Sequence, residues 1–292
     1  MKQVTLLGFG GPETPKDVRP FLDRIVAGRP IPPQRYEQVV DHYRVIGGAS
    51  PFNELTRRQA NALQAELEAR GAALPVSVAY RFSEPFIADA ARAANARGDE
   101  IIAVILAAHQ SGTSWDKYVE LFPRARFTQP FYDKPGFVQA NAARIHDALT
   151  ALGRSDFSQT TLIFTAHSIP QAMAHRSGYE AQLQRSAQLA ARAAGATAYE
   201  IAYTSRSGPP AEPWLEPDVR DLLPVLSARG VREVLVDPIG FLCDHVEVLY
   251  DLDIGAAAVA NRLNMRLSRA RALNDHPTFI GALADAVQAC LG

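Results

Sequence analysis

The sequence predicts an α/β fold in which two similar Rossmann-like domains, each a parallel sheet flanked by helices, enclose a cleft. Three observations support this fold class. Short apolar runs alternate with helical patterns along almost all of the 292 residues, and this order is typical of parallel strands joined by right-handed helical crossovers. The same order of elements occurs twice, without a residue-level repeat. No Gly/Ser/Pro-rich linker separates the halves, so we expect them to pack tightly.

Strands are expected where short runs rich in Val, Ile, Leu, Phe and Thr are bounded by Gly, Pro or charged residues. In chain order these runs lie near residues 3–8, 74–80, 101–107, 125–129, 160–166, 199–204 and 232–238. Several of them are apolar throughout, which is typical of parallel strands that are covered on both faces.

Helices are expected between these strands, where apolar residues recur every three or four positions or alanine is frequent. They lie near residues 52–70, 84–97, 135–152, 178–194 and 215–229. In the first of them, Leu55, Leu63 and Leu67 share one side. A last helix is expected over 277–291, where Pro277 suits the first turn.

These elements divide the chain into three parts. Residues 1–145 form the expected N-terminal Rossmann-like half, and residues 146–270 form the C-terminal half. Residues 271–292 contain the last helix, which we expect to pack back on the first half.

Charge and composition exclude several classes of function. Lys and Arg total 30 and Asp and Glu total 31, without a long run of one sign, so a nucleic-acid partner is not expected. No stretch is long enough to span a membrane, and the apolar run near the start is too short for a signal peptide. We therefore expect a cytoplasmic protein. The two cysteines, Cys243 and Cys290, suffice neither for a disulfide framework nor for a thiolate metal site.

Histidines follow strand ends at three places. His167 ends the run TLIFTAHSIP, in which Pro170 cannot continue a strand. His109 ends IIAVILAAH, and His245 follows the run EVLVDPIGFLCD. A single such histidine is more often structural, but three at the edge where open α/β folds bind ligands indicate proton transfer or metal contact.

The segment 237–255 carries a row of acidic residues within a helical pattern. Glu247 and Asp251 are four residues apart and share a helix face, and Asp244 and Asp253 lie nearby. Like charges at this spacing destabilise a helix, so we expect a compensating cation or proton. The alternative is a solvated acidic face, although the intervening residues are strongly apolar. Oxygen and imidazole ligands suit transient handling of a divalent metal such as Fe²⁺.

Several blocks of the sequence, in this order, resemble the signature of the ferrochelatase family. The C-terminal blocks are FTAHSIP, SRSGPPAEPWLEPD and DPIGFLCDHVEVLYDLD, and the N-terminal blocks are LLGFGGPETPKDVRPFLDRI, HYRVIGGASPFNELT and AYRFSEPFIADA. The resemblance runs from about residue 4 to about residue 285. It implies a lyase that binds a free-base porphyrin in the cleft and inserts Fe²⁺ as part of haem biosynthesis.

The resemblance also implies roles for individual residues. His167 and Glu247 are the expected catalytic pair, facing each other from opposite walls of the porphyrin slot. They form the expected metal site with Asp251, on a helix that is often wide-turned in the family. Which of the pair takes the pyrrole protons and which first holds iron stays open. The expected porphyrin contacts are Phe9, Arg29, Tyr43, Ser50, His109 and Tyr118.

Two details, GFGGPE and AAHQSG, resemble the coproporphyrin III ferrochelatase branch of Gram-positive bacteria, whose product is coprohaem. Phe9 stands where some relatives carry a tyrosine that contacts iron, so an axial phenolate from this position is excluded. Gly255 interrupts the acidic row, and the outer metal site is expected to be weakened or absent. No permanently bound cofactor and no iron–sulfur cluster are expected, because Fe²⁺ is a substrate and the cluster cysteines are missing.

The expected partners are the porphyrin and Fe²⁺, with other enzymes of the haem pathway as candidate protein partners of a monomer. Three other functions remain open at this point. They are a protoporphyrin IX ferrochelatase, a chelatase that inserts cobalt or nickel into a sirohydrochlorin, and a non-catalytic carrier of haem or porphyrin.

Overall fold

The computed structural model describes residues 1–28, 31–208 and 211–291. Within these residues, the strands form two parallel sheets with the orders β2-β1-β3-β4 and β6-β5-β7-β8. The first sheet contains β1 (Lys2–Gly8), β2 (Val76–Tyr80), β3 (Glu100–Ile105) and β4 (Arg126–Phe127). The second contains β5 (Thr161–His167), β6 (Tyr199–Thr204), β7 (Glu233–Asp237) and β8 (Arg266–Arg269). The same strand order in both sheets confirms the predicted fold class.

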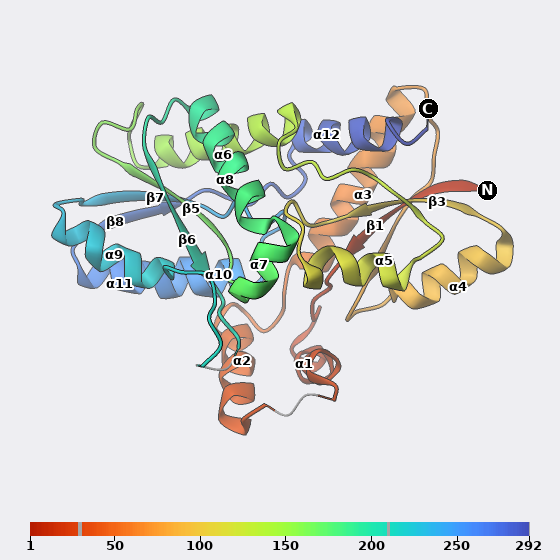
Figure 1. The fold of residues 1–292 in the computed structure, drawn as a ribbon, viewed down its shortest axis with the longest axis horizontal. Helices are drawn as coiled ribbons and strands as arrows, with labels where there is room; N and C mark the ends of the chain where they lie inside the picture. Colours follow the sequence, from red (N-terminus) through yellow and green to blue (C-terminus); the bar gives the residue numbers. More distant parts are fainter. Residues whose placement is uncertain (29–30, 209–210, 292) are drawn as a thin grey trace.

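Helices cover both sheets (Figure 1). The N-terminal half contains α1 (Val18–Val26), α2 (Pro33–Val45), α3 (Phe52–Ala69), α4 (Ile87–Arg97), α5 (Lys117–Leu121) and α6 (Pro135–Ala151). The rest of the chain contains α7 (Gln171–Ser177), α8 (Tyr179–Ala194), α9 (Val219–Ala228), α10 (Val246–Tyr250), α11 (Ala257–Arg262) and α12 (Pro277–Gln288). Short π-helical turns lie at Gly112–Asp116 and Asp251–Ala256, and a 3-10 turn lies at Pro15–Asp17.

Several elements were not predicted from the sequence, among them the short helices α5, α7 and α11. Strand β8 reads RLSR and is an edge strand, so it lacks the apolar run that marks a buried strand. Helices α1 and α2 project below the two sheets in Figure 1. Tyr43 is the one buried residue of α2. The segment that forms α2 therefore shows only a weak helical pattern of apolar residues in the sequence.

The largest core cluster joins the two halves. It contains Val4 and Leu6 from the first sheet and Leu162 and Phe164 from the second. Side chains of α6, α8 and α12 complete it, and α12 packs against both α3 and α6. The boundary expected at residue 145 lies inside α6. Because this core is shared, it fixes the positions of the carboxyl edges of the two sheets relative to each other.

Among the described residues, no helix combines the length and the apolar character that crossing a bilayer requires.

Candidate active site

The carboxyl ends of β5 and β7 bring His167 and the segment that carries Glu247 together. His167 is the last residue of β5, and Glu247 lies in the first turn of α10, which follows β7 through a loop. The loop passes very close to β5, since a Cβ on Gly240 would lie 2.5 Å from the Cβ of Ala166. Only glycine permits this approach, which brings the start of α10 to the sheet edge where ligands of open α/β folds bind.

His167 and Glu247 form a close pair. The His167 Nε2 atom lies 3.6 Å from Glu247 Oε1, and the two side chains are 32% and 38% exposed. The prediction that they face each other from opposite walls of a porphyrin slot is wrong. A flat macrocycle in van der Waals contact with both would separate them by about 7 Å. Both side chains therefore belong to one wall of the site, and they can act together on the same face of a ligand.

A backbone contact sets the tautomer of His167. Its Nδ1 lies within hydrogen-bond distance of the carbonyl oxygen of Ser168, and a carbonyl oxygen only accepts. Nδ1 therefore carries a hydrogen, and Nε2 is the ring nitrogen that faces Glu247. The hydroxyl of Tyr179 donates to the carbonyl of His167 at 3.0 Å and holds this strand end in place. Nε2 belongs to a half-buried side chain and can take a proton or bind a metal ion.

His245 orients the helix that carries Glu247. Its Nδ1 accepts the backbone N–H of Glu247 at 3.1 Å, which makes His245 the N-cap of α10. The ring packs between Phe241 and Phe52, with ring centroids 5.0 and 6.0 Å apart. Burial lowers the pKa of His245, so the ring stays neutral and keeps the lone pair that the cap needs. The structure thus gives this histidine a capping role.

Asp251 lies at the start of the π-helical turn 251–256, which confirms the wide turn that the family resemblance implied. The hydroxyl of Ser205 donates to Asp251 Oδ2. Ser205 has φ +63°, a left-handed conformation that is uncommon for residues other than glycine and often occurs at functional sites. Burial, with the negative charge of Glu247 adding to it, raises the pKa of Asp251 to about 6.

We expect Asp251→Asn to raise the free energy of unfolding at pH 7.5 by about 1 kcal/mol, because it removes a partly buried charge that Ser205 and Arg220 compensate only in part. The raised pKa means that Asp251 destabilises the folded state above pH 6, where it is ionised. This cost falls as the pH decreases from 6 toward the usual value of 3.8. Urea unfolding at pH 7.5 and pH 4 checks this: the gain should nearly vanish at pH 4, and an equal gain at both values would contradict it.

The predicted porphyrin contacts lie in different environments. Phe9 is 40% exposed at the end of β1, with its ring centroid 4.7 Å from that of Phe82. Tyr43 is buried on α2. Burial raises the pKa of its hydroxyl, and the charge of the nearby Glu247 carboxylate raises that pKa further. Ser50 is also buried, and its Oγ accepts the N–H of Phe52 at the start of α3.

His109 and Tyr118 are buried as well. His109 is 3% exposed, and its Nε2 is 2.9 Å from Ser186 Oγ. Tyr118 is buried beneath the guanidinium of Arg81, at 5.6 Å. Their contact with porphyrin stays a prediction. Arg29 lies outside the described residues.

Sequence reasoning missed several residues near the site. The guanidinium of Arg81 lies 5.8 Å from the ring centroid of Phe9 and 4.9 Å from that of Phe82. It follows β2 directly, so its position at a strand's carboxyl end was a usable signal. The rings of His42 and Tyr250 stack at 3.6 Å and link α2 to α10. No sequence pattern pairs those two residues.

Within residues 1–28, 31–208 and 211–291, no group of three or more His, Cys, Asp or Glu side chains is arranged to hold a metal ion. His167 and Glu247 instead offer two donor atoms of the types that bind divalent transition metals. Two protein ligands leave further coordination positions open to a second ligand. This arrangement suits a metal that passes from the protein to an acceptor.

Known proteins resemble this chain over nearly its full length. The family model described as ferrochelatase matches residues 2–291. A coproporphyrin III ferrochelatase of Mycolicibacterium vanbaalenii is 39% identical over 98% of this chain and 89% of its own length. One of Mycobacterium ulcerans is 41% identical over 94% of this chain and 83% of its own. A ferrochelatase of Rhodopirellula baltica is 38% identical over 98% of this chain and 85% of its own length.

Solved chelatase structures share the fold. CbiX, described as the terminal enzyme of sirohaem biosynthesis in denitrifying bacteria, aligns with a TM-score of 0.59 at 16% identity, covering 99% of this chain and all of its own. SirB from Bacillus subtilis with Fe³⁺ aligns with a TM-score of 0.57 at 12% identity, and the alignment covers 98% of this chain and 94% of SirB. These two likenesses concern the fold alone. The family match and the relatives at about 40% identity go further, and by them this chain belongs to the ferrochelatase family.

Proposed function

We propose that this protein inserts Fe²⁺ into coproporphyrin III to give coprohaem during haem biosynthesis. The observation that carries the proposal is the 3.6 Å pair of His167 Nε2 and Glu247 Oε1 at the carboxyl edge of the second sheet. Membership of the ferrochelatase family supports Fe²⁺ as a substrate. The names of the mycobacterial relatives support coproporphyrin III as the other substrate.

The chemistry requires a base and a route for the metal. As Fe²⁺ enters the macrocycle, two pyrrole N–H bonds break and two protons leave. The lone pair of His167 Nε2 is positioned to take a proton, and the carboxylate of Glu247 beside it stabilises the resulting imidazolium. Glu247 and Asp251 also form an acidic row along which Fe²⁺ can approach the pair.

Both roles fit one sequence of events. Fe²⁺ rests first on Glu247, with Asp251 behind it, and moves to the porphyrin nitrogens while His167 Nε2 accepts one pyrrole proton and solvent water takes the other. The positive charge that His167 gains then favours departure of the metal from the pair, because like charges repel at this distance. Tyr43, buried beside Glu247, and the exposed ring of Phe9 are candidate contacts for the macrocycle.

We infer that no cofactor is permanently bound and that one chain carries a complete site. Cys243 and Cys290 are buried singly in separate core clusters, which supports the absence of a cysteine-ligated cluster. We also infer a monomer that works alone or beside other haem-pathway enzymes. We infer that this activity takes place in the cytoplasm.

We expect kcat/KM with coproporphyrin III to exceed that with protoporphyrin IX by at least about tenfold, because charged substrate groups that find partners in a site discriminate strongly. The measurement is steady-state Fe²⁺ insertion with each porphyrin under anaerobic conditions. Equal or reversed values would favour the protoporphyrin IX alternative. Turnover only of cobalt or nickel with a sirohydrochlorin would favour the other chelatase class.

A further inference from the structure

Arg269 joins the two ends of the segment that carries the catalytic carboxylate. It is the last residue of β8, and its side chain is 11% exposed. Its Nε and Nη2 donate to the two carboxylate oxygens of Asp253 at 2.5 and 2.8 Å. Its Nη1 donates to Asp244 Oδ1 at 2.8 Å. Asp244 lies just before the N-cap of α10, and Asp253 lies inside the π-helical turn.

The position of α10 depends on contacts at both of its ends. The π-helical turn 251–256 interrupts the regular hydrogen-bond pattern, and such turns are where a helix can change direction. At the other end, Asn274 supports the same arrangement, since its Nδ2 donates to Asp244 Oδ2 at 2.8 Å and its Oδ1 accepts the N–H of Asp244 at 2.9 Å. Arg269 contacts both ends.

The charges around Arg269 explain why an arginine stands there. Asp244 is 10% exposed, and a carboxylate this deep needs a cation. The charge of Arg269 also opposes the rise in pKa that burial causes in Asp237 at the end of β7. A planar guanidinium can bind one carboxylate with two donors while giving a third to another, which a lysine cannot match.

We propose that Arg269 is a positioning residue for metal handling, which holds segment 244–253 so that Glu247 Oε1 lies beside His167 Nε2. It touches neither substrate and acts through the backbone of α10. The proposal rests on the proposed function in one respect, since it assigns the metal to this carboxylate. It extends that function to a residue on a strand that the sequence does not mark as functional.

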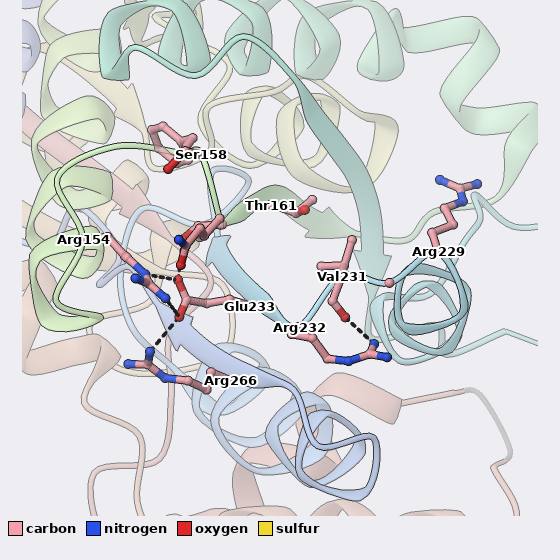
Figure 2. Close-up of a pocket in the computed structure, with 12 residues that line it drawn as sticks. Arg154, Ser158, Thr161, Arg229, Val231, Arg232, Glu233 and Arg266 are labelled. Carbon is pink, nitrogen blue, oxygen red and sulfur yellow. Dashed lines mark hydrogen bonds and ion pairs between the residues drawn. The ribbon is translucent and has the colours of Figure 1, made fainter.

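The same strand provides a matched control. Arg266 begins β8 at the opposite edge of the sheet, where it donates to Glu233 at 2.7 Å, as Figure 2 shows. Arg154 donates to the same carboxylate, so this cluster is an ion-pair network far from His167 along the strands. Arg266→Lys and Arg269→Lys make the same change on one strand, and only the second reaches the segment that carries Glu247.

The test measures kcat/KM for Fe²⁺ insertion, the Kd for coproporphyrin III, the Tm, and Co²⁺ binding to porphyrin-free protein by visible absorption. We expect Arg269→Lys to weaken Co²⁺ binding and to lower kcat/KM for Fe²⁺ by about 10- to 100-fold each, a range typical of residues that orient metal ligands. The Kd for porphyrin should stay within about twofold, because α10 moves relative to His167 while the remainder of the site does not. Arg266→Lys should lower only the Tm.

Equal Co²⁺ affinity and equal kcat/KM in the two variants would overturn the proposal, and so would an effect of Arg269→Lys on Tm alone. The Co²⁺ measurement separates this proposal from the proposed function. If the wild-type protein inserts iron into no porphyrin, the proposed function fails, and the ratio of Co²⁺ affinities still decides the role of Arg269. If Co²⁺ gives no signal, the ratio of kcat/KM values decides it.

Discussion

Glu247→Gln is expected to lower kcat for Fe²⁺ insertion by at least about 100-fold, while the Kd for porphyrin changes by no more than about twofold. The amide keeps the shape of the side chain and its place in the first turn of α10. It removes the negative charge 3.6 Å from His167 Nε2, and with it both a metal ligand and the group that stabilises a protonated imidazole. The loss should therefore fall on the chemical step.

Glu54→Gln is the matched control, because Glu54 is an exposed residue in the first turn of α3. The two variants are compared in steady-state turnover and in porphyrin fluorescence titrations. Equal losses of turnover and of porphyrin affinity in Glu247→Gln would count against the assignment of Glu247, since they would indicate a general distortion of the cleft.

His167→Ala is expected to lower kcat by about 100- to 10,000-fold, the range over which a positioned acid–base group contributes. Removing the ring deletes the Nε2 lone pair and leaves the carboxylate of Glu247 without its neighbour. The truncation also opens space beside an exposed carboxylate, so added imidazole should restore part of the activity. Turnover is measured with and without imidazole over a range of pH.

The control for this variant is His175→Ala, which removes an exposed histidine from α7. The comparison also decides between an enzyme and a carrier. If the wild-type protein binds porphyrin, and iron insertion is negligible and the same in both the wild type and His167→Ala, the protein is a carrier of porphyrin or haem.

Much of the fold could be predicted because its strands are local features of the sequence. The run that forms β5 is apolar over its whole length, and all but its two end residues are buried, which is what a central parallel strand requires. The edge strand β8 and the helix α2 could not be predicted, because nearly all of their residues are exposed or half-buried and carry weak apolar periodicity.

The residue types of the site could also be predicted, but their roles were assigned unevenly. His167 and Glu247 stand out because one ends a buried strand, the other follows one through a loop, and each carries a group suited to proton or metal chemistry. His245 has the same sequence context, yet its Nδ1 caps α10. The amino-acid sequence around a histidine does not show whether its imidazole faces a ligand or accepts a backbone N–H.

The sequence by itself determined the α/β class, the doubled strand order and the identity of the histidine and glutamate at the sheet edge, since each depends on short stretches of chain. Tertiary structure alone decided that the two side chains share one wall, 3.6 Å apart, and that Arg269 braces the segment between Asp244 and Asp253. The physical reason is distance along the chain. Eighty residues separate His167 from Glu247, and their approach depends on how the loop at Gly240 packs on β5 and where β8 places a guanidinium.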